Sequence, residues 1–425
     1  MDSSCVQTSF ERGVFRTTQI ANCAPQGFAT LDEAGKLTYV RRRTQRILCD
    51  TAHRRMRRAH AHASLLRGTD DALEIRAHER VVWVGDVHGD LFSLLSVLEH
   101  ARLVRVPRDV HADATACYVG DTHTRVAPID HAQLLQIEWS GKSAAVVLLG
   151  DLLDNRRGRE QDRTGVCGLI GTQQVLLDIV VHLARQARAR GGRVVWVLGN
   201  HCCQNAVAGA TRFCDDYAPV YYRGPHGEPR HVCKLAEGGG LEFDVAWREI
   251  VRGAMRAVGA LAVLVATCDG EPWAVAVHGF VDPRLEKAFG LCRARGPADA
   301  LTNAHLVNQA YNAMIYDGAS PEAAHVHAQS PDVLPTWCRA RTGDGCAAAR
   351  DLFGVDLLFK AHDVQHHAHC ARGVCFLDVA MGRSFHANRP PRANGQRTSA
   401  RLAYMESDQT GAHRSFHFNA TYDAR

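Results

Sequence analysis

The sequence comprises 425 residues, 46% of them hydrophobic, with a formal net charge of +5 at pH 7. A chain of this length and composition can bury a substantial core. Its longest apolar stretch, residues 260–268, is far shorter than the roughly 18 residues of a membrane-spanning helix. We therefore expect neither an integral membrane protein nor a membrane partner.

Residues 1–75 contain no motif and are interpreted as a basic N-terminal extension. They show no charged start followed by an apolar segment, and the fifteen cysteines of the chain include no Cys-x-x-Cys pair. We therefore expect an intracellular protein, cytoplasmic or nuclear, in a reducing compartment. An arginine cluster here suits a nuclear signal or a nucleic-acid contact, although a solvated helix face is the simpler interpretation. The cluster consists of Arg41, Arg42, Arg43, Arg46, Arg54, Arg55, Arg57 and Arg58.

From residue 76 onward, short apolar segments recur, and each ends at a polar side chain. The segment 81–84 reads as a buried strand, so Asp86 and His88 emerge where that strand ends. Side chains that follow strands in this way converge on one edge of a sheet. The segments and the residues after them are 81–84 with Asp86 and His88, 145–149 with Asp151, 194–198 with Asn200, 274–277 with His278, and 355–359 with His362.

These strand ends offer carboxylate oxygens and imidazole nitrogens. Hard and borderline divalent ions prefer such donors, and the motifs supply them without thiolates. A pair of ions is held when one carboxylate bridges them, and we assign this role to Asp151. Glycines precede Asp86, Asp151 and Asn200, where they allow the backbone to turn sharply toward a shared cleft.

Helices are predicted between the strands. The apolar spacing of residues 91–100 and 172–190 is helical, and two glycines at 191–192 end the second helix. Repeated strand–helix–strand units predict a largely parallel sheet with right-handed crossovers. The fold class is therefore α/β, with one domain over residues 76–420.

Two insertions are expected in this domain, at about residues 104–142 and 202–260, and a last strand is expected near 401–405. The first insertion contains the sequence Gly-Asp-Thr-His at 120–123, which imitates the first motif. A polar run with a proline follows it, so we expect a loop or hairpin there. The histidine-rich segment 366–369 lies after a strand end and is also interpreted as a loop.

The ordered motifs resemble those of the calcineurin-like metallophosphoesterase superfamily, within it the phosphoprotein phosphatase branch. The final motif carries a single histidine, His362, where other branches have Gly-His-x-His. Residues 337–339, 357–365 and 375–381 are similar to the closing segment of the Shewanella-like phosphatases. The resemblance implies layered β-sheets flanked by helices, with ligands at the strand ends.

The resemblance also implies two divalent or mixed-valence metal ions, of Mn, Fe or Zn. One ion is expected to bind three of the strand-end residues and the other four, with the bridging aspartate shared. The first set is Asp86, His88 and Asp151, and the second set is Asp151, Asn200, His278 and His362.

Catalytic and substrate-binding roles follow from the same resemblance. His201 is expected to protonate the leaving oxygen, and Asp154 is expected to hold its imidazole. Arg156, in preference to Arg157, and Arg339 are expected to bind phosphate oxygens through their guanidinium groups.

Three positions depart from the phosphoprotein phosphatase pattern. Asn155 stands where that branch has an arginine, Cys202 where it has a glutamate, and Phe280 where it has a second glycine. The metal ligands are retained, so these differences concern the substrate pocket more than the chemistry. Cys202 and its neighbour Cys203 are interpreted as pocket lining.

The sequence thus favours a dinuclear metal-dependent phosphoester hydrolase, of the serine/threonine protein phosphatase type, which uses a metal-bridging hydroxide. Its partner would be a phosphorylated protein or small molecule. One alternative is a hydrolase of dinucleoside polyphosphates or other phosphodiesters. Another is an inactive scaffold that binds phosphorylated partners or nucleic acid.

Overall fold

Apolar strands form several β-sheets with helices around them, so the fold is mixed α/β. The computed structural model describes residues 4–11, 14–21, 30–31, 37–38, 74–75, 80–116, 118–120, 127, 129, 131–154, 166–168, 170–209, 214, 220–268, 270–339, 344–379, 381, 398–408 and 412–422.

A five-stranded sheet contains the first three predicted strands. Strands β6 (Val81–Val84), β10 (Ala145–Leu148) and β12 (Arg193–Trp196) are parallel, with β10 in the middle. Their continuous apolar sequence suits strands that are buried on both faces. β22 (Thr398–Ser407) adds antiparallel to β6, and β23 (His413–Tyr422) adds antiparallel to β22.

The other two predicted strands lie in a second, six-stranded sheet. β18 (Glu271–Ala276) and β19 (Leu357–Lys360) are parallel neighbours at its centre. The remaining strands are β20 (His369–Ala371), β21 (Val374–Phe376), β17 (Leu264–Cys268) and β5 (Glu74–Ile75), in the order β20-β21-β19-β18-β17-β5. The motif strands are parallel neighbours within each sheet, as expected, but the single sheet expected from the sequence was wrong, because these strands divide between two mixed sheets.

Aromatic side chains join the two sheets. The ring of Trp83 on β6 stacks on Phe359 of β19, with centroids 3.9 Å apart and planes 3° from parallel. Trp273 of β18 contacts both rings edge-on. Because each strand ends just beyond these aromatic residues, the packing brings the strand ends of both sheets together.

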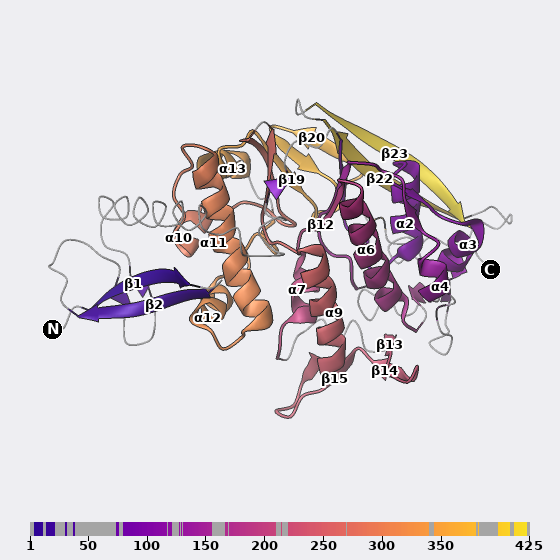
Figure 1. The fold of residues 1–425 in the computed structure, drawn as a ribbon, viewed down its shortest axis with the longest axis horizontal. Helices are drawn as coiled ribbons and strands as arrows, with labels where there is room; N and C mark the ends of the chain where they lie inside the picture. The colour runs from indigo at the N-terminus through magenta and orange to yellow at the C-terminus, as the bar shows by residue number, and fades with distance from the viewer. Residues whose placement is uncertain are drawn as a thin grey trace.

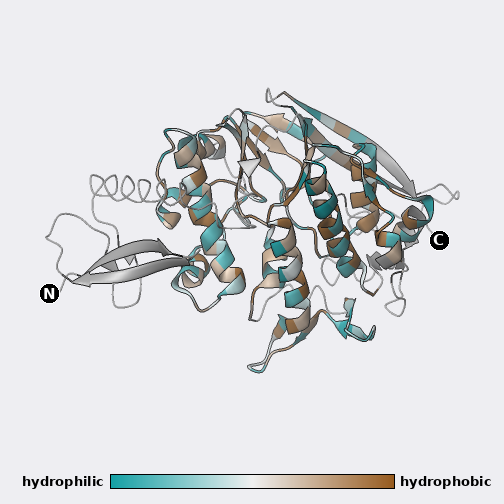
Figure 2. Cartoon of the chain, viewed as in Figure 1, coloured by the Kyte–Doolittle hydropathy of each residue, from teal (hydrophilic) through white to brown (hydrophobic). Residues whose placement is uncertain are grey.

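The two predicted helices are present as α2 (Leu91–His100) and α6 (Thr172–Ala189). α9 (Val245–Val258) packs beside α6, and both contact β12 (Figure 1). Figure 2 shows hydrophobic stretches alternating with hydrophilic ones along these helices, as expected for helices with one face on a sheet.

A second helical group covers the six-stranded sheet. α11 (Pro297–Tyr316) contacts β17 and β18, and α12 (Pro321–Ala328) and α13 (Asp344–Phe353) pack against it. The short helix α10 (Leu285–Phe289) precedes this group in sequence, and another short helix, α7 (Asn200–Ala206), packs on α9.

The two segments predicted as insertions contain short elements. Residues 104–142 form β7 (Val104–Arg105), α3 (Arg108–Ala116), β8 (Tyr118–Gly120), α4 (His131–Leu134) and β9 (Glu138–Trp139). Residues 202–260 include α9, β13 (Tyr221–Arg223), β14 (Pro229–His231), β15 (Cys233–Leu235) and β16 (Leu241–Phe243). The other strands are β1 (Ser4–Glu11), β2 (Val14–Ala21), β3 (Thr30–Leu31), β4 (Leu37–Thr38) and β11 (Val166–Gly168).

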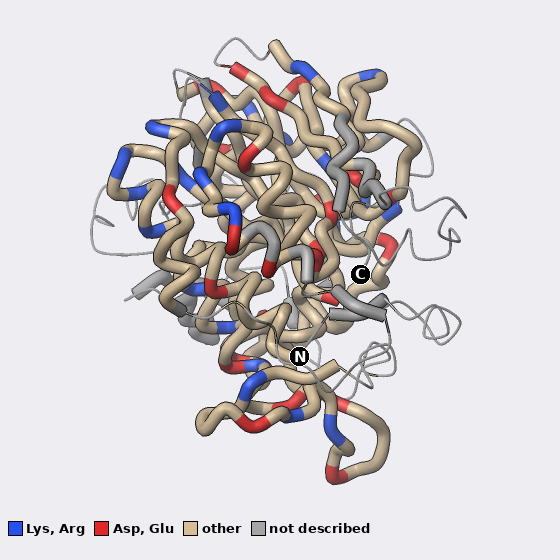
Figure 3. Tube along the Cα trace, turned by 90° about the vertical axis from the view of Figure 1, so that its right-hand side faces the viewer, with Lys and Arg blue, Asp and Glu red and all other residues tan. Residues whose placement is uncertain are grey.

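Several sequence features lie wholly or largely outside the described residues, among them the arginine cluster at 41–58 and residues 121–123 of the Gly-Asp-Thr-His segment. In the described part of the chain, basic and acidic residues are interspersed (Figure 3). Among the described helices, none is both long and apolar enough to cross a bilayer.

Candidate functional site

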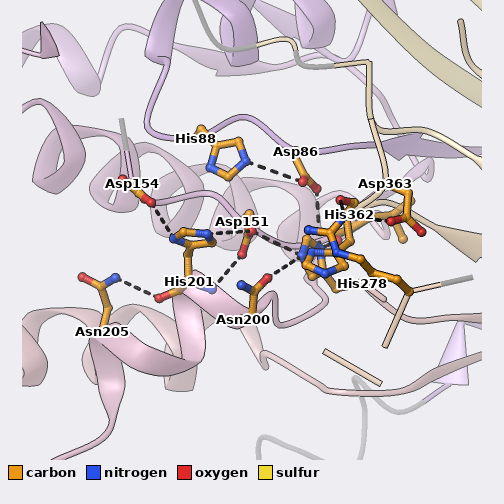
Figure 4. A network of polar contacts seen from close by, with 12 residues as sticks. Asp86, His88, Asp151, Asp154, Asn200, His201, Asn205, His278, His362 and Asp363 are labelled. Atoms are coloured by element: carbon orange, nitrogen blue, oxygen red, sulfur yellow. Dashed lines mark hydrogen bonds and ion pairs between the residues drawn. The ribbon is translucent and has the colours of Figure 1, made fainter. Parts of the chain in front are cut away.

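The strand-end residues of both sheets meet in one buried cluster (Figure 4). Asp86 and His88 follow β6, and Asp151 follows β10. The other members are Asn200, the first residue of α7 after β12, His278 after β18, and His362 after β19. Each of these six side chains is at most 8% exposed.

The backbone at these strand ends turns through an unusual conformation. His88, Asp151 and His362 have φ values of 47°, 34° and 68°, in the left-handed region that residues other than glycine adopt at a cost. Two glycines allow the strand ends to approach the side chains of neighbouring strand ends closely. A Cβ on Gly150 would lie 2.4 Å from His278 Nδ1, and one on Gly199 would lie 2.0 Å from Asp151 Oδ1.

One donor group in the cluster consists of Asp86, His88 and Asp151, whose ligand atoms all lie within 4.8 Å of one another. His88 Nε2 is 3.6 Å from Asp86 Oδ2. The backbone nitrogen of His88 donates to the carbonyl oxygen of Asp151 at 2.8 Å, which ties the ends of β6 and β10 together.

A second donor group consists of Asp151, His278 and His362, again within 4.8 Å. His278 Nδ1 lies 2.8 Å from the carbonyl oxygen of Leu149, to which it donates, and 3.5 Å from Asp86 Oδ1, so Nε2 is the nitrogen left to act as a ligand. That Nε2 is 3.3 Å from Asp151 Oδ2 and 3.1 Å from Asn200 Oδ1. His362 Nε2 is buried and has no hydrogen-bond partner in the described part of the chain.

Charge in the cluster perturbs three pKa values. Burial alone would raise the pKa of Asp151, but the nearby charges of His278, His201 and His88 hold it well below its usual range. Burial lowers the pKa of His278, but the carboxylates of Asp151 and Asp86 outweigh this and raise it to about 9. Burial and the charge of His278 lower the pKa of His362 to about 2.

These shifts describe a site that favours a cation. The carboxylate of Asp151 is stabilised in its charged form, and Asp151 and Asp86 attract positive charge strongly enough to raise the pKa of the buried His278. The lowered pKa of His362 favours its neutral imidazole, and an ion bound beside His278 would displace the proton that Asp151 and Asp86 attract to that ring. The residues therefore fit the two-ion expectation, with Asp151 common to both donor groups.

His201 lies beside the cluster and is oriented by two aspartates. Its backbone nitrogen donates to Asp151 Oδ1 at 3.0 Å, and its Nδ1 is 2.5 Å from Asp154 Oδ2. Asp154 is fully buried, and its own backbone nitrogen donates to Gln173 Oε1 at 2.7 Å. His201 Nε2 lies 3.9 Å from Asp151 Oδ2, so this nitrogen is on the side of the cluster.

Arg339 is the predicted phosphate-binding arginine that the structure describes. Its Nη1 donates to Asp363 Oδ1 at 2.9 Å and to the carbonyl oxygen of His362 at 3.4 Å. Its side chain is 60% exposed, so the guanidinium lies at the edge of the cluster. Arg156 and Arg157, with Asn155, lie outside the described residues.

Sequence reasoning assigned no role to Asp363 or Lys360. Lys360 is fully buried, its Nζ is 2.5 Å from Asp363 Oδ2, and the same carboxylate holds Arg339. Its ammonium also lies 5.4 Å from the centroid of the Phe280 ring. One feature of the sequence could have indicated this interaction. A charged residue stands on each side of His362 at the end of an apolar strand.

Comparisons with known proteins give distant likenesses. No protein family and no curated protein matches the sequence. The fold is similar to a cold-active protein tyrosine phosphatase of a psychrophile Shewanella species, with 13% identity and a TM-score of 0.46 over 97% of this chain and 98% of that one. It is also similar to the phosphatase domain of the Legionella effector WipB, with 14% identity and a TM-score of 0.34 over 70% and 98%.

A third solved structure is the phosphopantetheinyl hydrolase of Mycobacterium tuberculosis, with 14% identity and a TM-score of 0.24 over 64% of this chain and 92% of that one. The first two neighbours are phosphatases, but none of the three identifies a calcineurin-like family. Because the scores are low, the functional inference rests on the geometry of the site.

Proposed function

We propose that this protein is a phosphoester hydrolase that uses two divalent metal ions, in the manner of the calcineurin-like phosphatases that its motifs resemble. The observation that carries the proposal is the pair of buried donor groups that share Asp151. A carboxylate common to two clusters of carboxylate and imidazole donors is the arrangement that a two-ion centre requires.

Asp86, His88 and Asp151 would hold one ion, and Asp151, Asn200, His278 and His362 the other. Bound there, the ions would supply an activated water and positive charge for the phosphoryl oxygens. The hydrogen bond from His278 Nδ1 to the Leu149 carbonyl fixes which nitrogen faces the ion.

His201 is proposed as the general acid. Asp154 Oδ2 lies 2.5 Å from its Nδ1 and orients the ring, so Nε2 is the atom that would donate to the leaving oxygen. The burial of Asp154 keeps this contact away from water. A proton delivered there prevents the leaving alkoxide from carrying a full negative charge.

Arg339 is proposed to bind the phosphoryl group of the substrate. Its partner Asp363 limits where the guanidinium can lie, and Lys360 in turn holds Asp363. An arginine that is already held in one position loses less conformational entropy when its guanidinium binds an anion through two hydrogen bonds. We propose a phosphoserine or phosphothreonine protein as the substrate class.

Replacement of Asp151 tests the shared-ligand assignment. Asp151→Asn keeps an acceptor for the backbone of His201 but removes the charge that two cations would share. We expect the purified variant to lose both metal ions in elemental analysis and all measurable hydrolysis. Asp109→Asn, at an exposed aspartate of α3, should retain both. An Asp151→Asn variant with two ions and full activity would exclude the proposal.

A substrate panel tests the class. Phosphoserine and phosphotyrosine peptides, an aryl phosphate and a dinucleoside polyphosphate should be compared by kcat/KM with the same metal-loaded enzyme. A preference for the phosphoserine peptide supports the proposed class. A preference for the dinucleoside polyphosphate would assign the protein to phosphodiester hydrolysis with the same metal centre.

A further inference from the structure

A second cluster of metal-binding side chains lies between two β-hairpins. The hairpin of β20 and β21 places Cys370 directly opposite Cys375, and the two sulfurs form a disulfide. In a reducing compartment, which we expected from the sequence, these two cysteines would be free thiols instead of a disulfide. The disulfide forms because the antiparallel register brings the two Cα atoms to 3.9 Å from each other.

The hairpin of β22 and β23 lies beside the hairpin of β20 and β21 (Figure 1). Met405 Sδ lies 3.5 Å from Cys370 Sγ. A ring nitrogen of His413 and the two cysteine sulfurs all lie within 4.8 Å of one another. The imidazole and the thioether thus approach the same pair of sulfur atoms.

The sheet register explains why these two side chains share a face. His413 pairs with Ser407, and Met405 precedes Ser407 by two residues on β22. Side chains two apart on a strand point to the same side, and directly paired residues do likewise. The face of β22 and β23 that carries Met405 and His413 therefore faces the cysteine hairpin.

A disulfide alone needs neither an imidazole nor a thioether beside it. Two thiolates, one imidazole and one thioether together form a donor set for a soft closed-shell ion. The set differs from the strand-end cluster, which contains only oxygen and nitrogen donors. His413 is exposed and Cys370 is partly exposed, so an ion can enter from solvent.

We propose that, after reduction of the disulfide, Cys370, Cys375 and His413 bind one Zn²⁺ or Cu⁺ ion, with Met405 as a fourth donor for Cu⁺. A phosphine or dithiol reductant supplies two electrons, and water or the dithiol supplies two protons, so that the disulfide becomes two thiols. The incoming ion then displaces one proton from each thiol.

The short separation of the two Cα atoms keeps both sulfurs together in the reduced hairpin. Only a small movement is needed, because a tetrahedral zinc site places each sulfur about 2.3 Å from the ion. The bound metal ion would then link the two hairpins, whereas the disulfide links two cysteines of the same hairpin.

Cobalt absorption tests the proposal in the full-length protein, because thiolate ligands give Co²⁺ a sulfur charge-transfer band that oxygen and nitrogen ligands do not give. Protein reduced with a phosphine, then freed of reductant, should show this band with one equivalent of Co²⁺ and lose it on addition of Zn²⁺. Oxidised protein should show no band. The band should persist in Asp151→Asn, which separates this site from the proposed catalytic centre.

Matched variants locate the site. Cys370→Ser should abolish the band, and His413→Ala should weaken Zn²⁺ binding by at least the roughly 10–100-fold that loss of an outer-shell partner costs. Cys233→Ser, at a cysteine of β15 outside any disulfide, and His417→Ala, whose Nε2 bonds the Ala368 carbonyl, should have no effect. Met405→Leu should weaken the binding of Cu⁺ and leave the binding of Zn²⁺ unchanged.

Two results would overturn the proposal. One is reduced protein, in which peptide mapping shows Cys370 and Cys375 as free thiols, that gives no sulfur band. The other is a band that survives Cys370→Ser. Since His413 is exposed, His413→Ala should fold normally, and unchanged Zn²⁺ affinity in that variant would exclude the histidine from the site.

Discussion

At the residue scale, His201 can be tested separately from the metal ligands. Its ring is held by Asp154 through Nδ1 at 2.5 Å, while only its backbone contacts Asp151 at hydrogen-bond distance. His201→Ala should therefore retain both metal ions. It should lose about 10²–10⁴ in kcat, the usual contribution of a positioned acid.

The leaving group provides the discriminating measurement. An aryl phosphate with an acidic phenol needs little protonation, so the loss in His201→Ala should be much smaller for it than for an alkyl phosphate. Asp154→Asn should show the same dependence more weakly, since it removes the contact that orients the ring but leaves the ring in place. Equal losses on both substrates would show that His201 is not the acid.

Arg339 is the second residue whose role can be isolated. Its guanidinium is mostly exposed but is held by Asp363, so its removal should affect substrate binding more than folding. Arg339→Ala should lower kcat/KM by roughly ten- to a hundredfold, because one charge-assisted hydrogen bond is worth about 1.5–3 kcal/mol. Arg339→Lys should recover part of this loss, since it restores charge without the planar fork.

Arg350→Ala is the matched control for Arg339. Arg350 is a comparably exposed arginine paired with a carboxylate, Asp356, and it has no proposed contact with substrate. Its replacement should leave kcat/KM unchanged. If Arg339→Ala behaves like this control, the phosphate is held by other groups.

The convergence of the strand-end side chains was predictable from the sequence, and the reason is local. Each donor follows an apolar strand within a few residues, so its position is determined by the strand that precedes it. The interaction of Lys360 with Asp363 was not predictable in this way. It depends on the left-handed turn at His362, with φ of 68°, which folds two charged residues toward each other.

At the element scale, helix α9 depends on a single capping residue. Asp244 Oδ1 accepts from the backbone nitrogen of Ala246 at 2.9 Å and from the hydroxyl of Tyr222 at 2.8 Å. Asp244→Ala should lower the free energy of unfolding by about 0.5–2 kcal/mol, the usual cost of a lost N-cap. Asp244→Asn should lose less, because its side-chain oxygen still accepts. Urea denaturation measures both.

The same carboxylate predicts a dependence on pH. Burial raises the pKa of Asp244, but hydrogen bonds from Tyr222, Trp247 and Ala246 outweigh it and lower the pKa below its usual value. A lowered folded-state pKa stabilises the protein above the unfolded pKa of about 3.9, and this contribution is lost as pH falls through the folded pKa. The stability difference between wild type and Asp244→Ala should shrink below pH 4. A constant difference would contradict the assignment.

Helices and strands were predictable from periodicity, but the division of the strands between two sheets was not. α2 begins and ends where its apolar spacing predicts, because that pattern is local. The pairing of β22 with β6 joins segments far apart in sequence and is reinforced by Trp83 Nε1, which donates to Ser407 Oγ at 2.8 Å. Nothing in either segment alone specifies that partner.

At the scale of the whole molecule, the proposed metal centre lies where the two sheets meet. Asp86, Asp151 and Asn200 follow strands of the five-stranded sheet, and His278 and His362 follow strands of the six-stranded sheet. The donor group of Asp151, His278 and His362 draws on both sheets. An ion bound there would therefore stabilise the packing of one sheet on the other, in addition to any catalytic role.

Metal removal should consequently lower the melting temperature. An ion that binds only the folded state adds about 2.7 kcal/mol when its free concentration is 100 times its Kd. Chelation of the metal-loaded wild type should lower Tm by several degrees in calorimetry, and metal readdition should reverse it. Asp151→Asn should start at the lower Tm and respond little to the chelator, because its shared ligand is gone. If chelation empties the wild type of metal by elemental analysis and Tm does not move, the ions do not hold the two sheets together.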